Sequence, residues 1–321
     1  MGDATSKMPI TKDGRPSLTA VVTCFNEENT IEEFFHRLKA ALGSEGRVYE
    51  IVIVNDGSRD NTWGKIKDLF ACEDCVRVVL DFFKNAGQLA ALTAGIAEAR
   101  GSAVLLMDSD LQLDPEELPG LMAAYDEGND FVTGYRSDRR DPAIRTVPSL
   151  LANFIMRKAS QSNLRDFGCT IKVINGTLLR AFPYGPDHVF NVPELVRRVE
   201  RVAEVPVTHH PRPLGKSGWT FAKLWRYNMD NVMIALERPF QYVAALSALG
   251  SLLLVIRVLY AIVADVKILD KVTNGLLLNA LAFVLLVLTA LLAVIGEFTV
   301  RNFMKLQRAP AYIIRERLEK Q

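Results

Sequence analysis

Two long apolar stretches in the last third of the chain, Tyr242 to Val263 and Leu276 to Val300, constrain the fold more than any other feature. Each is long enough to cross the roughly 30 Å hydrocarbon core of a bilayer as a helix, and each contains one charged residue, Arg257 in the first and Glu297 in the second. They predict a transmembrane hairpin, with spans at about 242–263 and 276–300 inside a membrane segment from 239 to 301.

The distribution of charge predicts the orientation of this hairpin. Charges between the two stretches cancel, whereas residues 302–321 carry more basic than acidic side chains and are expected to form a basic cytosolic tail. A two-span hairpin then returns the N-terminal domain to the cytosol as well. Residues 1–16 are polar and lack the apolar core of a signal peptide, so we expect a disordered N-terminal tail.

The overall charge argues against a nucleic-acid partner. Lys and Arg together number 38 and Asp and Glu 37, which leaves a formal net charge of +1 in a chain of 321 residues. Without a basic excess the chain has no general attraction for DNA or RNA. Any electrostatic recognition must therefore be local.

Short apolar runs alternate with helical patterns from about residue 17 onward. The runs are residues 18–23, 49–54, 76–80, 103–107 and 131–133, and helical periodicity is found in residues 31–42 and 86–100. This alternation predicts an α/β fold with a mostly parallel sheet. Because ligands of such sheets bind at the carboxyl ends of the strands, the polar residues after each run are the candidates for function.

Two amphipathic segments lie between this domain and the apolar hairpin. Residues 143–160 and 216–238 each place apolar side chains at helical spacing, with basic side chains beside them. In a soluble domain such stripes would pack on the sheet as core. The neighbouring hairpin instead favours two helices that lie at the membrane interface.

Asp108, Asp110 and Gln112 follow the apolar run at 103–107 at alternate positions. Their oxygens are hard donors of the kind that hold Mg²⁺ or Mn²⁺ against a diphosphate. The alternative is a solvated acidic turn, but the position after a predicted strand favours the metal site. No EF-hand loop, P-loop or GxGxxG motif is found in the sequence.

Two further motifs permit more than one interpretation. Asp56, in Asn55-Asp56-Gly57-Ser58, can bind a nucleobase or ribose at the end of a strand or can simply form a turn. The pair His209 and His210 is expected near a strand end, in a structural role.

Five short motifs follow one another in a fixed order: Phe25 to Glu28, Asn55 to Ser58, Asn85 to Gln88, Asp108 to Gln112 and Gly134 to Arg136. In this order, and followed by an apolar hairpin, they resemble the family 2 glycosyltransferases. The strongest resemblance is to the polyprenyl-phosphate glycosyltransferases, a group that includes dolichol-phosphate mannose synthase and undecaprenyl-phosphate 4-deoxy-4-formamido-L-arabinose transferase. It extends from about Leu18 to Tyr312.

The resemblance implies a GT-A, Rossmann-like catalytic domain at 17–215. It also implies a metal-dependent, inverting transfer of a hexosyl or pentosyl group from a UDP- or GDP-sugar to undecaprenyl or dolichyl phosphate. The product would be a polyprenyl-phosphate-sugar that serves cell-envelope glycan or lipid modification. By the same analogy we expect an integral protein of a bacterial inner membrane, and both a monomer and a homo-oligomer fit the sequence.

The resemblance also assigns roles to individual residues. The candidate catalytic residues are Asp110, Asp166 and Arg136. The candidate donor-nucleotide residues are Asn26, Glu28, Asp56 and Asp108. The acceptor phosphate is expected to contact Arg136, Arg145, Ser149 and Arg212, and the metal ligands are expected to be Asp108, Asp110 and Gln112.

The sequence departs from the family pattern at several positions. Asn55 replaces a frequent Asp, and Thr23 stands where a proline is usual.

Two other functions also fit the sequence. One is a membrane-anchored family 2 transferase that glycosylates a saccharide or a diacylglycerol lipid, and the other is a non-catalytic scaffold that binds nucleotide sugars.

Overall fold

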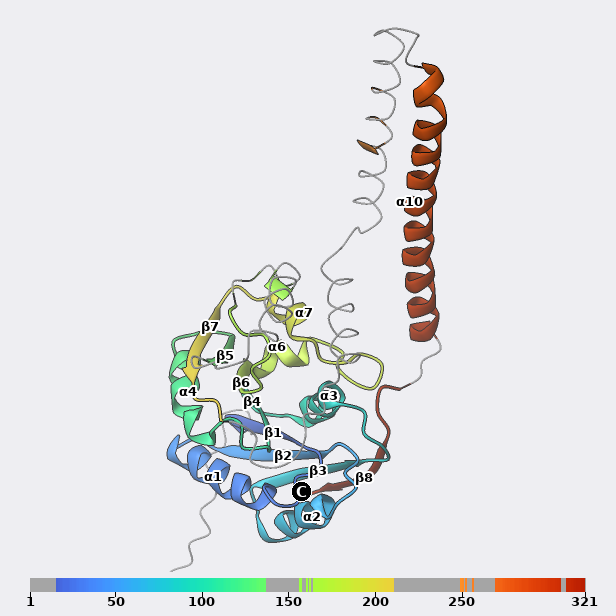
Figure 1. Ribbon diagram of the computed structural model, residues 1–321. Coiled ribbons are helices and arrows are strands. Elements are labelled where there is room, and N and C mark those ends of the chain that lie inside the picture. The colour runs from blue at the N-terminus through green and yellow to red at the C-terminus, as the bar shows by residue number, and fades with distance from the viewer. Residues whose placement is uncertain are drawn as a thin grey trace, which may run out of the picture. The chain divides into compact units, whose positions relative to one another are not determined.

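One eight-stranded sheet organises the N-terminal part of the chain (Figure 1). The computed structural model describes residues 16–136, 156–157, 160, 162, 164–210, 249–250, 252, 256, 269–306 and 310–320. The strands are β1 (Leu18–Cys24), β2 (Tyr49–Asn55), β3 (Val76–Phe82), β4 (Ala103–Asp108), β5 (Phe131–Arg136), β6 (Lys172–Asn175), β7 (Val202–Val207) and β8 (Ile314–Glu319). Their order across the sheet is β7-β5-β6-β4-β1-β2-β3-β8.

Most strands of this sheet run in one direction. β1 pairs in parallel with β2 and β4, β2 with β3, and β5 with β7, whereas β6 and β8 are antiparallel to their neighbours. The register brings Thr23 opposite Asp108 and Cys24 opposite Asn55, and Asn55 in turn lies opposite Asp81. The carboxyl ends of β4, β1, β2 and β3 are therefore level, which places the polar residues that follow them along one edge.

Helices cover both faces of the sheet. α1 (Ile31–Ser44), α2 (Thr62–Cys72) and α4 (Leu118–Asp126) share one apolar core with the sheet, and the short helix η1 (Pro115–Glu117) directly precedes α4. α3 (Gln88–Glu98), α6 (Gly176–Arg180) and α7 (Val192–Val196) belong to the core of the other face. This arrangement of layers is the expected α/β architecture with a mostly parallel sheet.

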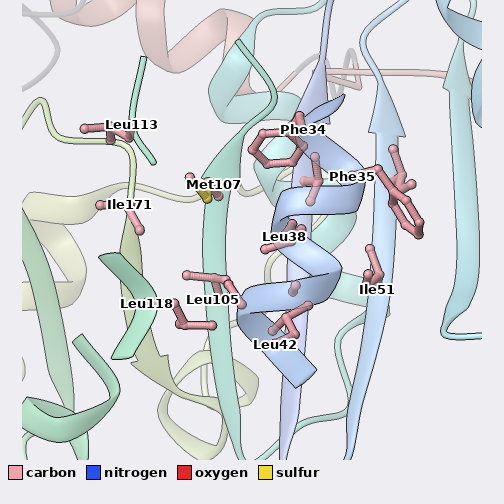
Figure 2. Packing of buried hydrophobic residues seen from close by; sticks show 14 of the residues in the cluster. Phe34, Phe35, Leu38, Leu42, Ile51, Leu105, Met107, Leu113, Leu118 and Ile171 are labelled. Atoms are coloured by element: carbon pink, nitrogen blue, oxygen red, sulfur yellow. The ribbon is translucent and has the colours of Figure 1, made fainter. Parts of the chain in front are cut away.

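The packing of α1 explains why its sequence is helical and amphipathic. Phe34, Phe35, Leu38 and Leu42 recur at helical spacing and are at most 1% exposed. Figure 2 shows them against the sheet, where Leu105 of β4 is among the residues of the same cluster. Burying a large apolar side chain contributes roughly 1.5–3 kcal/mol, so this one face supplies a large share of the free energy that holds the helix in place.

The five apolar runs of the sequence form β1 to β5, as predicted, and the helical periodicity corresponds to α1 and α3. Strands β6, β7 and β8 were not expected from those runs. β6 lies between β4 and β5 in the sheet, and β7 lies beside β5 at one edge.

Residues 302–321, which were expected to form a basic cytosolic tail, contain the end of one helix and one strand. Residues 302–306 belong to a long helix, and residues 314–319 form β8, antiparallel to β3 with Val78 opposite Glu319. Charged side chains of this segment form ion pairs. Arg317 lies 2.9 Å from Glu98 and 2.7 Å from Glu319. Tyr312, just before the strand, is buried and stacks on Phe82 with ring centroids 4.9 Å apart.

A second unit comprises Leu236–Ala309, whereas Pro310–Gln321 belongs with Met1–Ala235. In it the structure describes α10 (Leu269–Leu306), a helix of 38 residues that contains the predicted span 276–300. Its segment Phe283–Val300, with a mean hydropathy of 2.5, is long and apolar enough to cross a membrane. Among the described helices it is the one that meets this criterion of length and composition.

Several predicted features lie outside the described residues. They are the N-terminal tail apart from Pro16, the amphipathic segment 216–238, most of the segment 143–160, most of the first apolar stretch, and the side chains of Arg145, Ser149, Arg212 and Arg257.

Candidate active site

Asp108 ends β4 at the edge where the carboxyl ends of the strands are level. Thr23 donates a hydrogen bond to Oδ1 of Asp108, and the amide of Gln88, the first residue of α3, donates one to Oδ2. Burial, together with the negative charge of Asp110, raises the pKa of Asp108 to about 6. The site thus holds two nearby carboxylates whose mutual repulsion a cation would relieve.

The turn after β4 fixes the second carboxylate of the motif. The backbone N–H of Gln112 donates to Oδ1 of Asp110 over 3.2 Å, and Leu111 between them has a φ of +55°. A left-handed backbone is uncommon for such a side chain and is tolerated where surrounding contacts enforce it. The N–H of His210 supplies one such contact, 2.9 Å from the carbonyl of Gln112.

The two histidines have structural contacts, as expected. His209 forms a β-bridge with Leu113, and Nε2 of His210 lies 2.6 Å from a carboxylate oxygen of Asp114. They hold the segment after β7 against the turn that carries Asp110 and Gln112.

The donor set is compatible with Mg²⁺ or Mn²⁺. Within the described residues no group of three His, Cys, Asp or Glu side chains could hold a metal ion by itself. Such a cation is commonly held by one or two carboxylates together with substrate phosphates and water. Asp108 and Asp110 therefore fit a metal that binds with a diphosphate, and the ligand role of the Gln112 side chain stays a prediction.

Asn26 and Glu28 join the loop after β1 to the loop after β2. The N–H of Asn26 donates to Oγ of Ser58 over 2.9 Å, and its Oδ1 accepts from the N–H of Arg59 over 2.9 Å. Glu28 accepts from the N–H of Asn61 over 2.9 Å. Both candidate nucleotide residues thus also shape the loop edge on which a nucleotide would bind.

Asp56 joins this edge to the loop after β3. Its carboxylate accepts hydrogen bonds from the N–H groups of Ala86 and Gly87, at 2.7 and 2.9 Å, and from the side-chain amide of Asn85 at 2.8 Å. The structure therefore gives Asp56 a turn-organising role, which was one of the two interpretations of its motif. The three loops meet at the carboxyl ends of β1, β2 and β3.

Gly57 permits the close approach of two of these loops. It has a φ of +63°, and a Cβ atom at this position would lie 2.6 Å from the carbonyl carbon of Lys84. Both the backbone conformation and the available space require glycine here.

Asn55, the departure from the family pattern, is explained by its neighbour on β3. Its Nδ2 donates to Oδ1 of Asp81 over 2.7 Å, and Asp81 is 1% exposed. An aspartate at position 55 would place two buried carboxylates against each other, which is unfavourable. The amide replaces this repulsion with a hydrogen bond.

Arg136 and Asp166, both candidate catalytic residues, are paired with each other. Nε and Nη2 of Arg136 donate to the two carboxylate oxygens of Asp166 at 2.7 and 2.9 Å, in the bidentate arrangement that fixes both groups strongly. Glu204 on β7 holds the backbone at Asp166, because its Oε1 accepts from the N–H groups of Arg165 and Asp166 at 2.6 and 3.2 Å. Glu204 was not among the residues expected to contribute.

Lys172 is a second residue that the sequence reasoning missed. It begins β6, is 5% exposed, and donates from Nζ to the carbonyl of Cys169. Burial lowers its pKa, while the negative charges of Asp166 and Asp108 act in the opposite direction. The sequence contained one signal for this role, a lysine directly followed by the apolar Val173 and Ile174. A cation in an apolar strand is rarely buried without a partner, so such a lysine is a candidate for a buried, paired residue.

Comparison with known proteins agrees with these motifs. The family model described as "Glycosyl transferase family 2" matches residues 19–183, about half of the chain. The dodecaprenyl-phosphate galacturonate synthase of Rhizobium johnstonii is 29% identical over 93% of this chain and 92% of its own length. Two proteins called undecaprenyl-phosphate 4-deoxy-4-formamido-L-arabinose transferase are also similar. That of Shewanella sediminis is 30% identical over 76% of each chain, and that of Pseudomonas paraeruginosa is 32% identical over 70% of this chain and 66% of its own.

The resemblance seen in the short motifs is therefore confirmed over a long alignment. The chain belongs to glycosyl transferase family 2.

Proposed function

We propose that the protein transfers a sugar from a nucleotide sugar to the phosphate of a membrane polyprenol. The observation that carries this proposal is the similarity to a dodecaprenyl-phosphate galacturonate synthase over 93% of the chain, far more than the residues 19–183 that the family model matches. The transferases for 4-deoxy-4-formamido-L-arabinose support the same acceptor class. The donor is a UDP- or GDP-sugar, and the lipid is undecaprenyl phosphate or a related polyprenyl phosphate.

The proposed reaction forms one bond and breaks another at the anomeric carbon. An oxygen of the acceptor phosphate attacks this carbon, and the bond between the carbon and the nucleoside diphosphate breaks with inversion. A phosphate monoester has a second pKa near 6, so at neutral pH the acceptor is largely dianionic and needs no strong base. The protein instead has to orient two anionic groups and limit their repulsion.

Asp108, Asp110 and Gln112 are the proposed ligands of Mg²⁺ or Mn²⁺. When bound, the cation would neutralise charge on the diphosphate leaving group. Thr23 and Gln88 hold the Asp108 carboxylate in place through their hydrogen bonds. Asn26, Glu28 and Asp56 are proposed to shape the loops that receive the nucleotide.

Arg136 and Asp166 are proposed to lie on the acceptor side. The bidentate contact with Asp166 fixes the plane of the Arg136 guanidinium, and Glu204 fixes the backbone at Asp166. Arg145, Ser149 and Arg212 complete the proposed acceptor-phosphate site. The amphipathic segments 143–160 and 216–238 are proposed to bring it to the headgroup level.

We further propose that α10 is the second span of a membrane hairpin, with residues 242–263 as the first. The apolar segment Phe283–Val300 supports this assignment, and the positive residues after it support a cytosolic catalytic domain. The setting that fits these relatives is a bacterial inner membrane.

The decisive experiment measures the release of nucleoside diphosphate by the detergent-purified full-length protein. The reaction contains Mg²⁺ or Mn²⁺, a panel of UDP- and GDP-sugars, and short-chain polyprenyl phosphate, diacylglycerol or no acceptor. Asp110→Ala is compared with Asp126→Ala, a control on α4 whose carboxylate is half exposed. We expect release that requires polyprenyl phosphate and that Asp110→Ala reduces by roughly 100-fold or more.

Other outcomes would contradict the proposal in distinct ways. Release with diacylglycerol but not with polyprenyl phosphate would change the acceptor. Nucleotide binding without release under any acceptor would indicate a scaffold that binds nucleotide sugars.

A further inference from the structure

A buried carboxylate links the strand that follows α10 to the loop edge of the proposed donor site. Asp81, at the carboxyl end of β3, is 1% exposed, and its Oδ1 accepts a hydrogen bond from Asn55. Its Oδ2 accepts no hydrogen bond within the described part of the chain, but it lies 3.3 Å from Nη1 of Arg315 on β8. A buried anion depends strongly on such a cation, since removing one partner leaves the other uncompensated.

The other side of Asn55 continues toward the loop after β1. Oγ of Ser58 donates to Oδ1 of Asn55, and the same hydroxyl accepts from the N–H of Asn26 over 2.9 Å. The contacts therefore run without a gap from Arg315 through Asp81, Asn55 and Ser58 to Asn26. Asn26 itself has a φ of +56°, so its backbone depends on the contacts that surround it.

Arg315 is held in position by contacts other than Asp81. Its Nη2 donates to the carbonyl of Phe83 over 2.8 Å, and its guanidinium carbon lies 5.4 Å from the centroid of the Phe83 ring. Arg315 therefore lies over an aromatic ring just after the carboxyl end of β3, and Phe83 is still 59% exposed. These contacts order an arginine that is otherwise half exposed.

We infer that Arg315 is a positioning residue for the donor nucleotide, acting on Asn26 through Asp81, Asn55 and Ser58. This inference rests on the proposed function, which places the nucleotide on the loops after β1, β2 and β3. The donor site would thus receive a contribution from β8, a strand far away in the sequence. None of the motifs before residue 137 includes this strand. Arg315 does not touch the nucleotide but sets the shape of the loop edge that binds it.

The rest of β8 provides a matched comparison. Arg317 is two residues further along the same strand, is 40% exposed, and is held by ion pairs to Glu98 and Glu319. Arg315 is 48% exposed and is likewise ion-paired. The two arginines should therefore contribute similarly to the attachment of β8, but Arg315 is the one with the connection to Asn55.

The test measures the binding of UDP and of GDP, each with Mg²⁺, to the detergent-purified full-length protein by titration calorimetry. The variants are Arg315→Gln, Arg315→Lys and Arg317→Gln, and thermal unfolding is measured on the same samples. We expect Arg315→Gln to weaken binding by roughly two- to thirtyfold, the range in which residues that do not contact a ligand modulate its affinity. Arg315→Lys should recover most of the loss, whereas Arg317→Gln should lower the unfolding temperature comparably and leave the affinity unchanged.

A double variant identifies the route of the effect. If Arg315 acts through Asp81, the combination of Arg315→Gln with Asp81→Asn should weaken binding no more than the stronger single variant, because coupled residues are not additive. Additive losses would contradict this route.

Failure of the inference is distinguishable from failure of the proposed function. If the wild type binds a nucleotide and transfers sugar while Arg315→Gln binds equally well, or if Arg315→Gln and Arg317→Gln weaken binding equally, the inference is wrong and the function stands. If the wild type binds neither nucleotide, the donor class itself is wrong and the positioning role is lost with it.

Discussion

At the scale of single residues, several polar side chains at the strand ends hold the loops in shape as well as being candidates for ligand binding. Asp56 accepts three hydrogen bonds from residues 85–87, and Asn26 and Glu28 are committed to the loop after β2. A substitution at such a residue would change loop shape and ligand contact together. Experiments that separate the two should alter the loops without removing a polar group.

Gly57→Ala is one such substitution. The added Cβ would meet the backbone at Lys84 and would force an alanine into a left-handed conformation, so we expect a loss of roughly 1–3 kcal/mol in the free energy of unfolding and weaker nucleotide binding. Chemical denaturation and calorimetric titration measure the two effects. The control is Gly43→Ala inside α1, where a Cβ would meet nothing within 4 Å and helix propensity should stabilise by up to about 1 kcal/mol. If the two variants had equal effects, Gly57 would not be needed for the close approach of the two loops.

Glu204 offers a test of the acceptor side. Glu204→Ala removes the acceptor of two backbone N–H groups at Arg165 and Asp166, so the Arg136–Asp166 pair should lose its orientation. We expect kcat to fall roughly 10- to 100-fold while the affinity for nucleotide stays the same, since misplacement of a catalytic group by about 1 Å can have this effect. Glu204→Gln keeps an oxygen acceptor and should retain most of the activity. A change in nucleotide affinity with unchanged kcat would rule out this role for Glu204.

At the scale of elements, apolar runs were sufficient to predict some strands and not others. β1 to β4 are buried by helices on both faces, so their sequences are almost continuously apolar and the signal is strong. β8 reads Ile-Arg-Glu-Arg-Leu-Glu, and its side chains are exposed or half-buried. Charged residues are common on edge strands because they discourage pairing with other chains, so β8 could not be told from a solvated tail without its partner β3.

The candidate site follows the same division. Asp108 and Asp110 were predictable because a local motif follows a recognisable strand. Glu204 and Arg315 were not, since each acts on a segment far away in the sequence and neither belongs to a motif. Tertiary pairing, rather than local pattern, decides which charged residues support a site.

The contact between α1 and η1 gives a prediction about pH. Burial would raise the pKa of Asp114, but hydrogen bonds from Arg37 and His210 more than offset it, and the pKa lies below its usual range. The hydrogen bond from Arg37 likewise lowers the pKa of Glu116. A carboxyl group with a depressed pKa in the folded state stabilises above its unfolded pKa, and this contribution is lost as the pH falls through the folded value.

Arg37→Gln should therefore reduce stability at pH 7 by less than about 1 kcal/mol, because these ion pairs are partly exposed. The difference from wild type should shrink as the pH falls below the ordinary carboxyl pKa values of 3.8 for Asp and 4.5 for Glu. Thermal unfolding followed by circular dichroism across this pH range is the measurement, with the exposed Arg59→Gln as control. A difference that grows on acidification would show that the assigned ion pairs are not its source.

At the scale of the whole molecule, the chain combines a sheet domain with a helix that presents apolar side chains. Leu285 and Leu292 of α10 are 65% and 68% exposed, which water would disfavour and lipid would not. We expect the full-length protein to stay in the membrane pellet after an alkaline carbonate wash.

Substituting both leucines by aspartate should release more protein than the wild type does, because a charged residue near the centre of a span opposes insertion of α10 by roughly 2.5–3.5 kcal/mol while residues 242–263 would still supply one span. The variant with isoleucine at both positions is the matched control and should remain in the pellet. Retention of the aspartate variant at the wild-type level would show that α10 contributes nothing to the attachment to the membrane.

The antiparallel strand β8 also imposes an order on biosynthesis. A ribosome reaches residues 314–319 only after it has made all of α10, and until then β3 has unpaired backbone groups along one side. Open strand edges recruit other chains, so a nascent chain at this stage is prone to aggregation unless it is shielded. Insertion of the apolar helix before β8 emerges would tether each unfinished domain to the membrane and keep it apart from its neighbours. The membrane would then assist folding in addition to being the site of the reaction.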